Sequence, residues 1–207
     1  MPSGYENIYL KLVPRLAACD FAESAERLGM EITREGHIQI PFLGRTYLVT
    51  KEGARPVDGG PVDVNNLSVL LYYVLSGGCG QPKHSFVPLL RMTGVLEGQW
   101  GQSSDLMQSP LVREFGGDYG KFREAALHIG GTCVEESAGK HEWAFLLLPK
   151  IPAKVIFYEA DEEFPAEVQI LLDETAPRFL EFECLAFLSG CFVGAMVQSA
   201  QDGRRNA

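Results

Sequence analysis

The chain has 207 residues, which is the length of one domain or of one domain with an appendage. Its hydrophobic fraction of 46% and its charged fraction of 22% are those of an ordinary globular protein. The 18 lysines and arginines stand against 27 aspartates and glutamates, which gives a net charge of -9. A field of this sign repels phosphate groups, so it argues against nucleic acids and anionic membranes as partners.

The five cysteines are odd in number, and no two of them have the CxxC spacing. This pattern is neither a disulfide framework nor the local signature of a zinc or iron–sulfur site. We therefore expect reduced thiols and a cytoplasmic location. The N-terminus lacks the long apolar core of a signal peptide. The longest uncharged apolar stretch, from Cys184 to Val197, has 14 residues and is too short to cross a bilayer.

Apolar residues at spacings of three and four predict a helix over residues 5–17, which Pro14 would kink or end. The same pattern predicts a second helix over 21–28 that stops at Gly29. Both helices precede the first segment with an alternating pattern, so the chain is expected to open with helical structure.

From residue 37 to residue 50 the period changes to two, on either side of the dipeptide Leu43-Gly44. This pattern predicts a β-hairpin. The glycine- and proline-rich segment 51–63 is expected to be a loop. A helix is then expected from 66 to 76, and because LSVLLYYVL is apolar on every side, this helix should be central.

Residues 77–103 show no assignable pattern. Ser109-Pro110 resembles a helix start, and Asp118 is expected to cap a further helix that reaches Ile129. Three double glycines each follow a helical stretch, which favours helix stops over phosphate-binding loops, since phosphate loops precede helices. These pairs are Gly77-Gly78, Gly116-Gly117 and Gly130-Gly131.

Three strands are predicted next, over residues 132–135, 143–148 and 154–159, and a long apolar helix closes the chain at about Val197. Helices at both ends with a mostly antiparallel sheet of about four to six strands between them make this an α+β protein. We expect a single globular domain over 1–198 and a disordered polar tail over 199–207.

The stretch DEEFPAEVQILLDETAPRFL, residues 161–180, has two interpretations. In the structural one, which we favour, Asp161 caps a helix that starts at Pro165, and Thr175 caps the last helix. In the functional one, Asp161, Glu163 and Asp173 converge on one metal or acid–base site. The functional interpretation requires the two ends of the stretch to meet.

Other residues are weaker candidates for chemistry. His84 follows Cys79 by five residues, but a solvated loop histidine is the simpler interpretation, and His37 and His141 are expected to be exposed. Trp100, in a glycine-rich loop, is either a platform for a ligand or a plug over the core. No GxSxG, P-loop, GxGxxG, HExxH or EF-hand pattern is present.

The last helix carries two pairs of interest. Cys184 and Cys191 lie two turns apart on one face, where they could line a pocket or act as small buried hydrophobic residues. Gly190 and Gly194 allow a second helix to approach closely, and we favour packing within the same chain.

Four segments carry a resemblance to a known family: LSVLLYYVL at 67–75, HSFVPL at 84–89, FGGDYGKFREAALHIGG at 115–131, and LPKIPAKVIFYEADEEFPAEVQILLDETAPRFLEFECLAFL at 148–188. They resemble the domain of unknown function 3786 family of anaerobic bacteria and archaea. The resemblance extends over about residues 5 to 195, and the last segment is its most specific part.

The family has no assigned activity, so the resemblance implies a setting rather than a reaction. Some members look fused to a four-cysteine iron–sulfur module of the kind found beside carbon monoxide dehydrogenase and corrinoid proteins, and this chain lacks that module. The resemblance therefore implies a redox or corrinoid setting in anaerobic metabolism. It also makes site candidates of Asp161, Glu163, Phe164, Pro165 and Asp173.

Our first hypothesis is a non-catalytic protein that binds a cofactor or a partner in anaerobic metalloenzyme metabolism, the partner being an iron–sulfur or corrinoid protein. The second is an enzyme with a carboxylate-centred site at Asp161, Glu163 and Asp173. The third is a structural interaction module, with which a homodimer is compatible. No particular cofactor and no metal site follow from the sequence. The candidate ligand-binding residues are Asp161, Glu163, Phe164, Asp173, Trp100 and His84.

Overall fold

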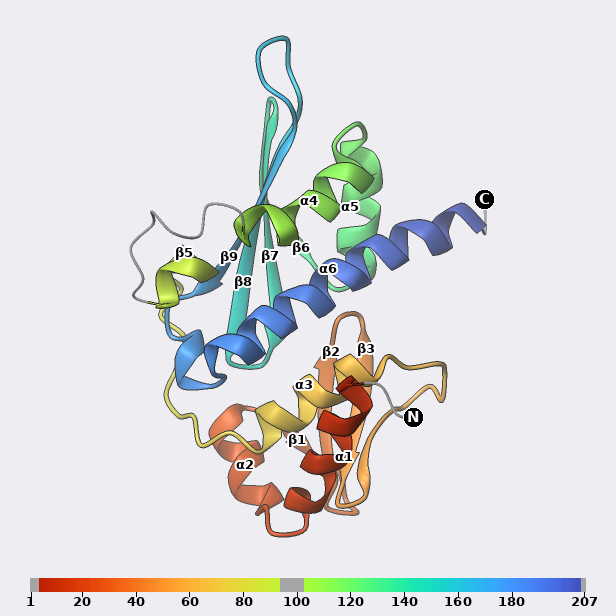
Figure 1. Cartoon of the computed structure of the whole chain (residues 1–207), viewed down its shortest axis with the longest axis vertical. Coiled ribbons are helices and arrows are strands. Elements are labelled where there is room, and N and C mark those ends of the chain that lie inside the picture. The colour runs from red at the N-terminus through yellow and green to blue at the C-terminus, as the bar shows by residue number, and fades with distance from the viewer. Residues whose placement is uncertain (1–3, 94–102, 206–207) are drawn as a thin grey trace.

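The computed structural model describes residues 4–93 and 103–205, and these form an α+β fold as expected. Two antiparallel sheets lie on opposite sides of one long helix, α6 (Phe182–Arg205), which crosses the middle of the molecule (Figure 1). The smaller sheet and the first three helices come from the N-terminal part of the chain. Trp100 lies outside the described residues.

The N-terminal part contains three helices and a four-stranded sheet in the order β1-β2-β3-β4. The helices are α1 (Gly4–Leu16), α2 (Phe21–Leu28) and α3 (Val64–Val74). The strands are β1 (Glu31–Ile32), β2 (Ile38–Phe42), β3 (Arg45–Thr50) and β4 (Gly53–Pro56). The strand β4 lies in the segment expected to be a loop, and it pairs with β3 because the chain turns back immediately after Thr50.

Local signals place these elements where the sequence predicts them. Asp20 caps α2 by accepting from the N–H groups of Ala22 and Glu23. Gly29 ends α2 at a φ of 71°, a left-handed conformation that glycine adopts without strain. The predicted hairpin is confirmed, with Leu43 and Gly44 forming the two-residue turn between β2 and β3.

The C-terminal part contains a five-stranded sheet in the order β5-β9-β8-β7-β6, with every neighbouring pair antiparallel. Its strands are β5 (Phe86–Pro88), β6 (Thr132–Ser137), β7 (Lys140–Leu148), β8 (Ile151–Tyr158) and β9 (Glu167–Asp173). Its helices besides α6 are α4 (Ser103–Phe115), α5 (Tyr119–His128) and the short 3-10 turns η1 (Leu89–Thr93) and η2 (Ala176–Arg178).

Three predictions in this part are wrong. Thr175 does not cap the last helix, which begins at Phe182, and its hydroxyl donates to Asp173 instead. The helix expected from Pro165 is instead the strand β9, in which Val168, Ile170 and Leu172 alternate toward the core and pair with β8. The helix α4 starts before Ser109 and continues through Pro110, so the dipeptide Ser109-Pro110 is not its first turn.

The helix α6 joins the two sheets into one core. It packs against α3 on one side and against α4 and α5 on the other. Its inward residues are Leu185, Leu188, Phe192 and Met196, all fully buried. It continues to Arg205, so residues 199–205, expected to be a disordered tail, are helical.

By length and composition, the segment Phe182–Gly203 of α6 could cross a membrane, with a mean hydropathy of 1.4. The sequence prediction that no segment is long enough to cross a bilayer rested on the uncharged stretch from Cys184 to Val197, which is shorter than this segment. One such helix is a weak indication, because the core helix of a soluble protein passes the same test of length and composition. In this structure 33% of the apolar window is buried.

Candidate functional site

The acidic residues at the start of the 161–180 stretch lie in the exposed loop between β8 and β9. Asp161 Oδ1 accepts from the N–H groups of Glu163, at 2.8 Å, and Phe164, at 2.7 Å. These two hydrogen bonds hold the pKa of Asp161 below its usual value, and the bond from Phe164 has the larger effect. Asp161 therefore satisfies backbone donors, as expected, but it does so in a turn and not at a helix start. Phe164 is 66% exposed.

Asp173 is the last residue of β9, at the other end of the strand, and it is fully buried. Its Oδ1 accepts from the N–H of Thr175 at 2.9 Å, from the Thr175 hydroxyl at 2.5 Å and from the N–H of Lys83 at 3.3 Å. Because a strand of this length spans about 20 Å, Asp161 and Asp173 do not share a pocket. The carboxylate-centred arrangement required by the second hypothesis is therefore not formed.

His84 does lie near Asp173, but through its backbone. The N–H of His84 is among the groups that lower the pKa of Asp173, while the imidazole ring lies 6.5 Å from the ring of Phe86. Flanking contacts hold this loop in place: Lys83 Nζ and the Ser85 hydroxyl both bind the Glu174 carboxylate, at 2.7 and 3.0 Å. Among the described residues, no group of three or more His, Cys, Asp or Glu could hold a metal ion.

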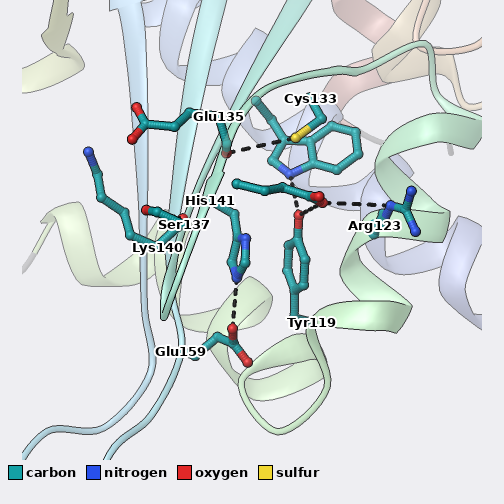
Figure 2. Close-up of polar contacts among 10 residues, drawn as sticks. Tyr119, Arg123, Cys133, Glu135, Ser137, Lys140, His141 and Glu159 are labelled. Carbon is teal, nitrogen blue, oxygen red and sulfur yellow. Dashed lines mark hydrogen bonds and ion pairs between the residues drawn. The ribbon is translucent and has the colours of Figure 1, made fainter.

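A polar cluster that the sequence did not predict lies between α5 and the strands β6 to β8 (Figure 2). The Tyr119 hydroxyl donates to Glu136 Oε1 at 2.8 Å and accepts from Trp143 Nε1 at 3.3 Å. Arg123 lies 3.7 Å from the same carboxylate. Burial, together with the bond to Glu136, raises the pKa of Tyr119 above its usual value, so the phenol stays protonated at neutral pH.

His141 lies inside this cluster and is only 7% exposed, so the prediction of an exposed histidine is wrong. Its ring stacks on Tyr119 with centroids 3.5 Å apart, and its Nε2 donates to Glu159 at 2.7 Å (Figure 2). The other nitrogen, Nδ1, is buried and has no partner among the described residues. His141 alternates with Trp143 and Phe145 on the inward face of β7, and that spacing of two was the available signal.

The contacts of this cluster join α5 to β6, to β7 and to the residue that follows β8, because Tyr119, Glu136, His141, Trp143 and Glu159 supply the bonded side chains. Tyr119 covers one face of the imidazole, and the ring of Phe157 lies 5.6 Å from that of Tyr119 and 6.4 Å from that of His141. The arrangement therefore holds the helix on the sheet.

A groove with a volume of about 710 Å³ lies between the two parts of the molecule. This volume is in the range of small-molecule sites. The β2–β3 turn, the loop before α3, the end of α5 and the second half of α6 form its walls. Its lining residues are Leu43, Gly44, Arg45, Tyr47, Pro61, Val62, Asp63, Asn65, Asn66, His128, Ile129, Phe187, Gly190, Cys191, Gly194, Ala195, Gln198, Ser199 and Asp202.

Small residues of α6 form the floor of the groove. A Cβ atom added at Gly190 or Gly194 would meet nothing within 4 Å, so these glycines face open space. The expectation that they pack against another helix of the chain is therefore wrong. Cys191 lies between them, and burial, followed by the negative charge of Asp63, raises the pKa of its thiol to about 12.

The β2–β3 turn closes one side of the groove by direct contact with α5. Gly44 has a φ of 78°, and a Cβ there would lie 2.7 Å from the carbonyl oxygen of His128. Arg45 then fixes the opposite wall: its guanidinium binds Asp58 at 2.5 and 3.0 Å and the Pro61 carbonyl at 2.7 Å. These contacts fix the position of the β2–β3 turn against α5 and of the loop before α3, and both segments line the groove.

The raised pKa of Cys191 predicts that its thiol reacts slowly with alkylating agents. At pH 8 roughly one Cys191 in ten thousand is a thiolate, which is the reactive form, whereas Cys79 is exposed. We expect iodoacetamide to modify Cys79 at least tenfold faster than Cys191, as measured by mass spectrometry of the tryptic peptides. The same reaction in urea is the control, and there the two rates should converge. Equal rates in the folded protein would contradict this description of the groove floor.

Comparison with known proteins gives one match. No curated protein and no solved structure matches the chain at a significant level. Residues 20–195, well over half of the chain, match a family without an assigned activity. The protein therefore belongs to the family described as Domain of unknown function (DUF3786).

Proposed function

We propose that this protein is a non-catalytic, cytoplasmic binding protein whose ligand site is the groove between the β2–β3 turn and α6. The observation that carries the proposal is the groove itself: a volume of about 710 Å³ over a floor of small residues, with polar side chains at its rim. The floor lets a ligand approach the helix backbone closely, because Gly190 and Gly194 present no side chain.

The same proposal assigns the protein to anaerobic metalloenzyme metabolism, with an iron–sulfur or corrinoid protein as the recipient or source of the ligand. The support for this setting is the family resemblance. An anaerobic preparation would test it: purified protein mixed with a purified corrinoid protein should give a complex by analytical ultracentrifugation. Separate sedimentation of both proteins at micromolar concentrations would count against this part of the proposal.

Filling the groove floor should weaken ligand binding without loss of fold. In Gly194→Leu, the new side chain occupies open space inside the groove, and leucine also favours the helix by about 0.5–1 kcal/mol over glycine. We expect fragments that bind the wild type, found by ligand-observed NMR, to lose at least tenfold in affinity. The melting temperature should stay equal or rise.

Gly203→Leu is the matched control, since Gly203 also faces open space on α6 but does not line the groove. It makes the same change of residue, composition and helix propensity, and it should leave fragment binding unchanged. Fragments that bind wild type and Gly194→Leu equally would show that the groove is not the ligand site.

A further inference from the structure

The fixed charges of the groove are mainly negative. Asp63 and Asp202 are the acidic residues that line it, and Arg45 is the only lysine or arginine among the lining residues. Asp202 is engaged in an interaction of its own, so the field of the groove rests on Asp63. The guanidinium of Arg45 binds both oxygens of Asp58, so that pair contributes little net charge. Asp63 caps α3 through the N–H of Asn65, and the positive end of that helix offsets about half of one elementary charge. The balance near Asp63 remains negative.

The end of α5 adds to this field. His128 is the last residue of α5, and both His128 and Ile129 line the groove. The C-terminal end of a helix carries about half of a negative charge, which favours cations within the last turn. The net charge of -9 on the whole chain acts in the same direction at longer range.

The pKa of Cys191 on the groove floor depends on this field. After burial, the charge of Asp63 is the next largest cause of the rise in its pKa, so the carboxylate acts on groups inside the groove and not only on its own helix. Asn65, two residues after Asp63, adds one further acceptor. Asn65 Nδ2 donates to Asp63 Oδ2 at 3.3 Å, which leaves Asn65 Oδ1 as a buried acceptor without a partner among the described residues.

From these charges and from the floor of small residues we infer that the ligand of the groove is an organic cation with an apolar body, such as an aromatic amine, and not an anion. This inference rests on the proposed function and names its substrate class. The apolar body lies against Gly190, Gly194 and Ala195, and the cationic end lies toward Asp63. A nucleotide or an organic acid would bring its negative charge into the field of Asp63.

Three indole compounds of nearly equal size test the class: tryptamine is a cation, tryptophol is neutral and indole-3-acetate is an anion. In NMR titrations at low ionic strength, tryptamine should bind at least fivefold more tightly than indole-3-acetate, with tryptophol between them. The difference is that expected for partly screened charge contacts. It should shrink as salt is added. Indole-3-acetate binding as tightly as tryptamine would overturn the inference.

Asp63→Asn removes the charge and keeps a good helix cap. It should weaken tryptamine binding about threefold, leave tryptophol unchanged and speed the alkylation of Cys191. Asp20→Asn is the matched control, because Asp20 caps α2 away from the groove, and it should alter none of these. Identical results for the two variants would overturn the role of Asp63.

The two proposals fail in different ways. If none of the three indoles binds but other fragments bind and are lost in Gly194→Leu, the cation inference falls and the groove remains the ligand site. If fragments bind equally to wild type and Gly194→Leu, the proposed function itself falls.

Discussion

Asp173→Ala is expected to lower the free energy of unfolding by about 3 kcal/mol. The carboxylate is fully buried and accepts from Thr175 and from the N–H of Lys83, so its removal leaves buried donors without an acceptor. The same bonds tie the 83–85 loop to the end of β9. Urea denaturation monitored by fluorescence gives the free energy directly.

The contribution of Asp173 to the free energy of unfolding should decrease as the pH falls. Burial raises the pKa of its carboxyl, but the bonds from Thr175, Lys83 and His84 outweigh burial, so the pKa in the folded state lies below the ordinary value. Its contribution to stability is therefore fully present above the unfolded pKa of about 4, and is lost as the pH falls through the folded pKa. The difference between wild type and Asp173→Ala should shrink over that window.

Asp161→Asn is the control from the same stretch of sequence. Asp161 is exposed, and asparagine keeps the oxygen that accepts from Glu163 and Phe164, so the loss should stay within about 0.5 kcal/mol. If Asp173→Ala costs no more than Asp161→Asn, or if its cost grows in acid, the role assigned to the buried carboxylate is wrong.

Local chemistry explains which elements the sequence predicted. The hairpin over 37–50 and the helix ending at Gly29 depend on residues within a few positions of each other, so the pattern contains all that is needed. The strand β9 does not. Pro165 and the acids before it suit a helix start, but Val168, Ile170 and Leu172 are buried by pairing with β8. A contact with another strand decided between the two structures.

The groove likewise depends on contacts between segments that are distant in the sequence. The sequence singled out two pairs on one helix; Gly190, Gly194 and Cys191 line the groove, whereas Cys184 does not. It could not place Arg45 or Asp63 opposite them, because the groove exists only once the two sheets have packed on α6. His141 was missed for a related reason. Its polarity suggested exposure, while its partner Glu159 follows the end of the neighbouring strand β8 and comes close only when β7 and β8 pair.

The last prediction concerns the hydroxyl of Tyr73, which joins three segments in the core. It donates to the carbonyl of Leu28 at 3.0 Å and accepts from the N–H of Lys150 at 3.0 Å, so it links the end of α2, the helix α3 and the β7–β8 turn. Burial raises the pKa of Tyr73, which keeps the hydroxyl protonated and able to make both bonds.

Tyr73→Phe keeps the ring and its packing but leaves a buried carbonyl and a buried N–H without this partner. At about 1–3 kcal/mol for each unsatisfied group, we expect a loss of about 3 kcal/mol in the free energy of unfolding, with an unchanged urea m-value. This is a large share of the total stability of about 5–15 kcal/mol typical of a domain. Hydrogen exchange at the Lys150 amide should accelerate more than exchange elsewhere in β7 and β8.

Tyr72→Phe is the matched control, since Tyr72 is the neighbouring residue on α3 and is only partly buried. It makes the same chemical change and should cost less than about 0.5 kcal/mol. Equal costs for the two variants, or unchanged exchange at Lys150, would show that the Tyr73 hydroxyl does not hold the two parts of the chain together. A loss confined to Tyr73→Phe would identify this single oxygen as a polar link between the N-terminal helices and the larger sheet.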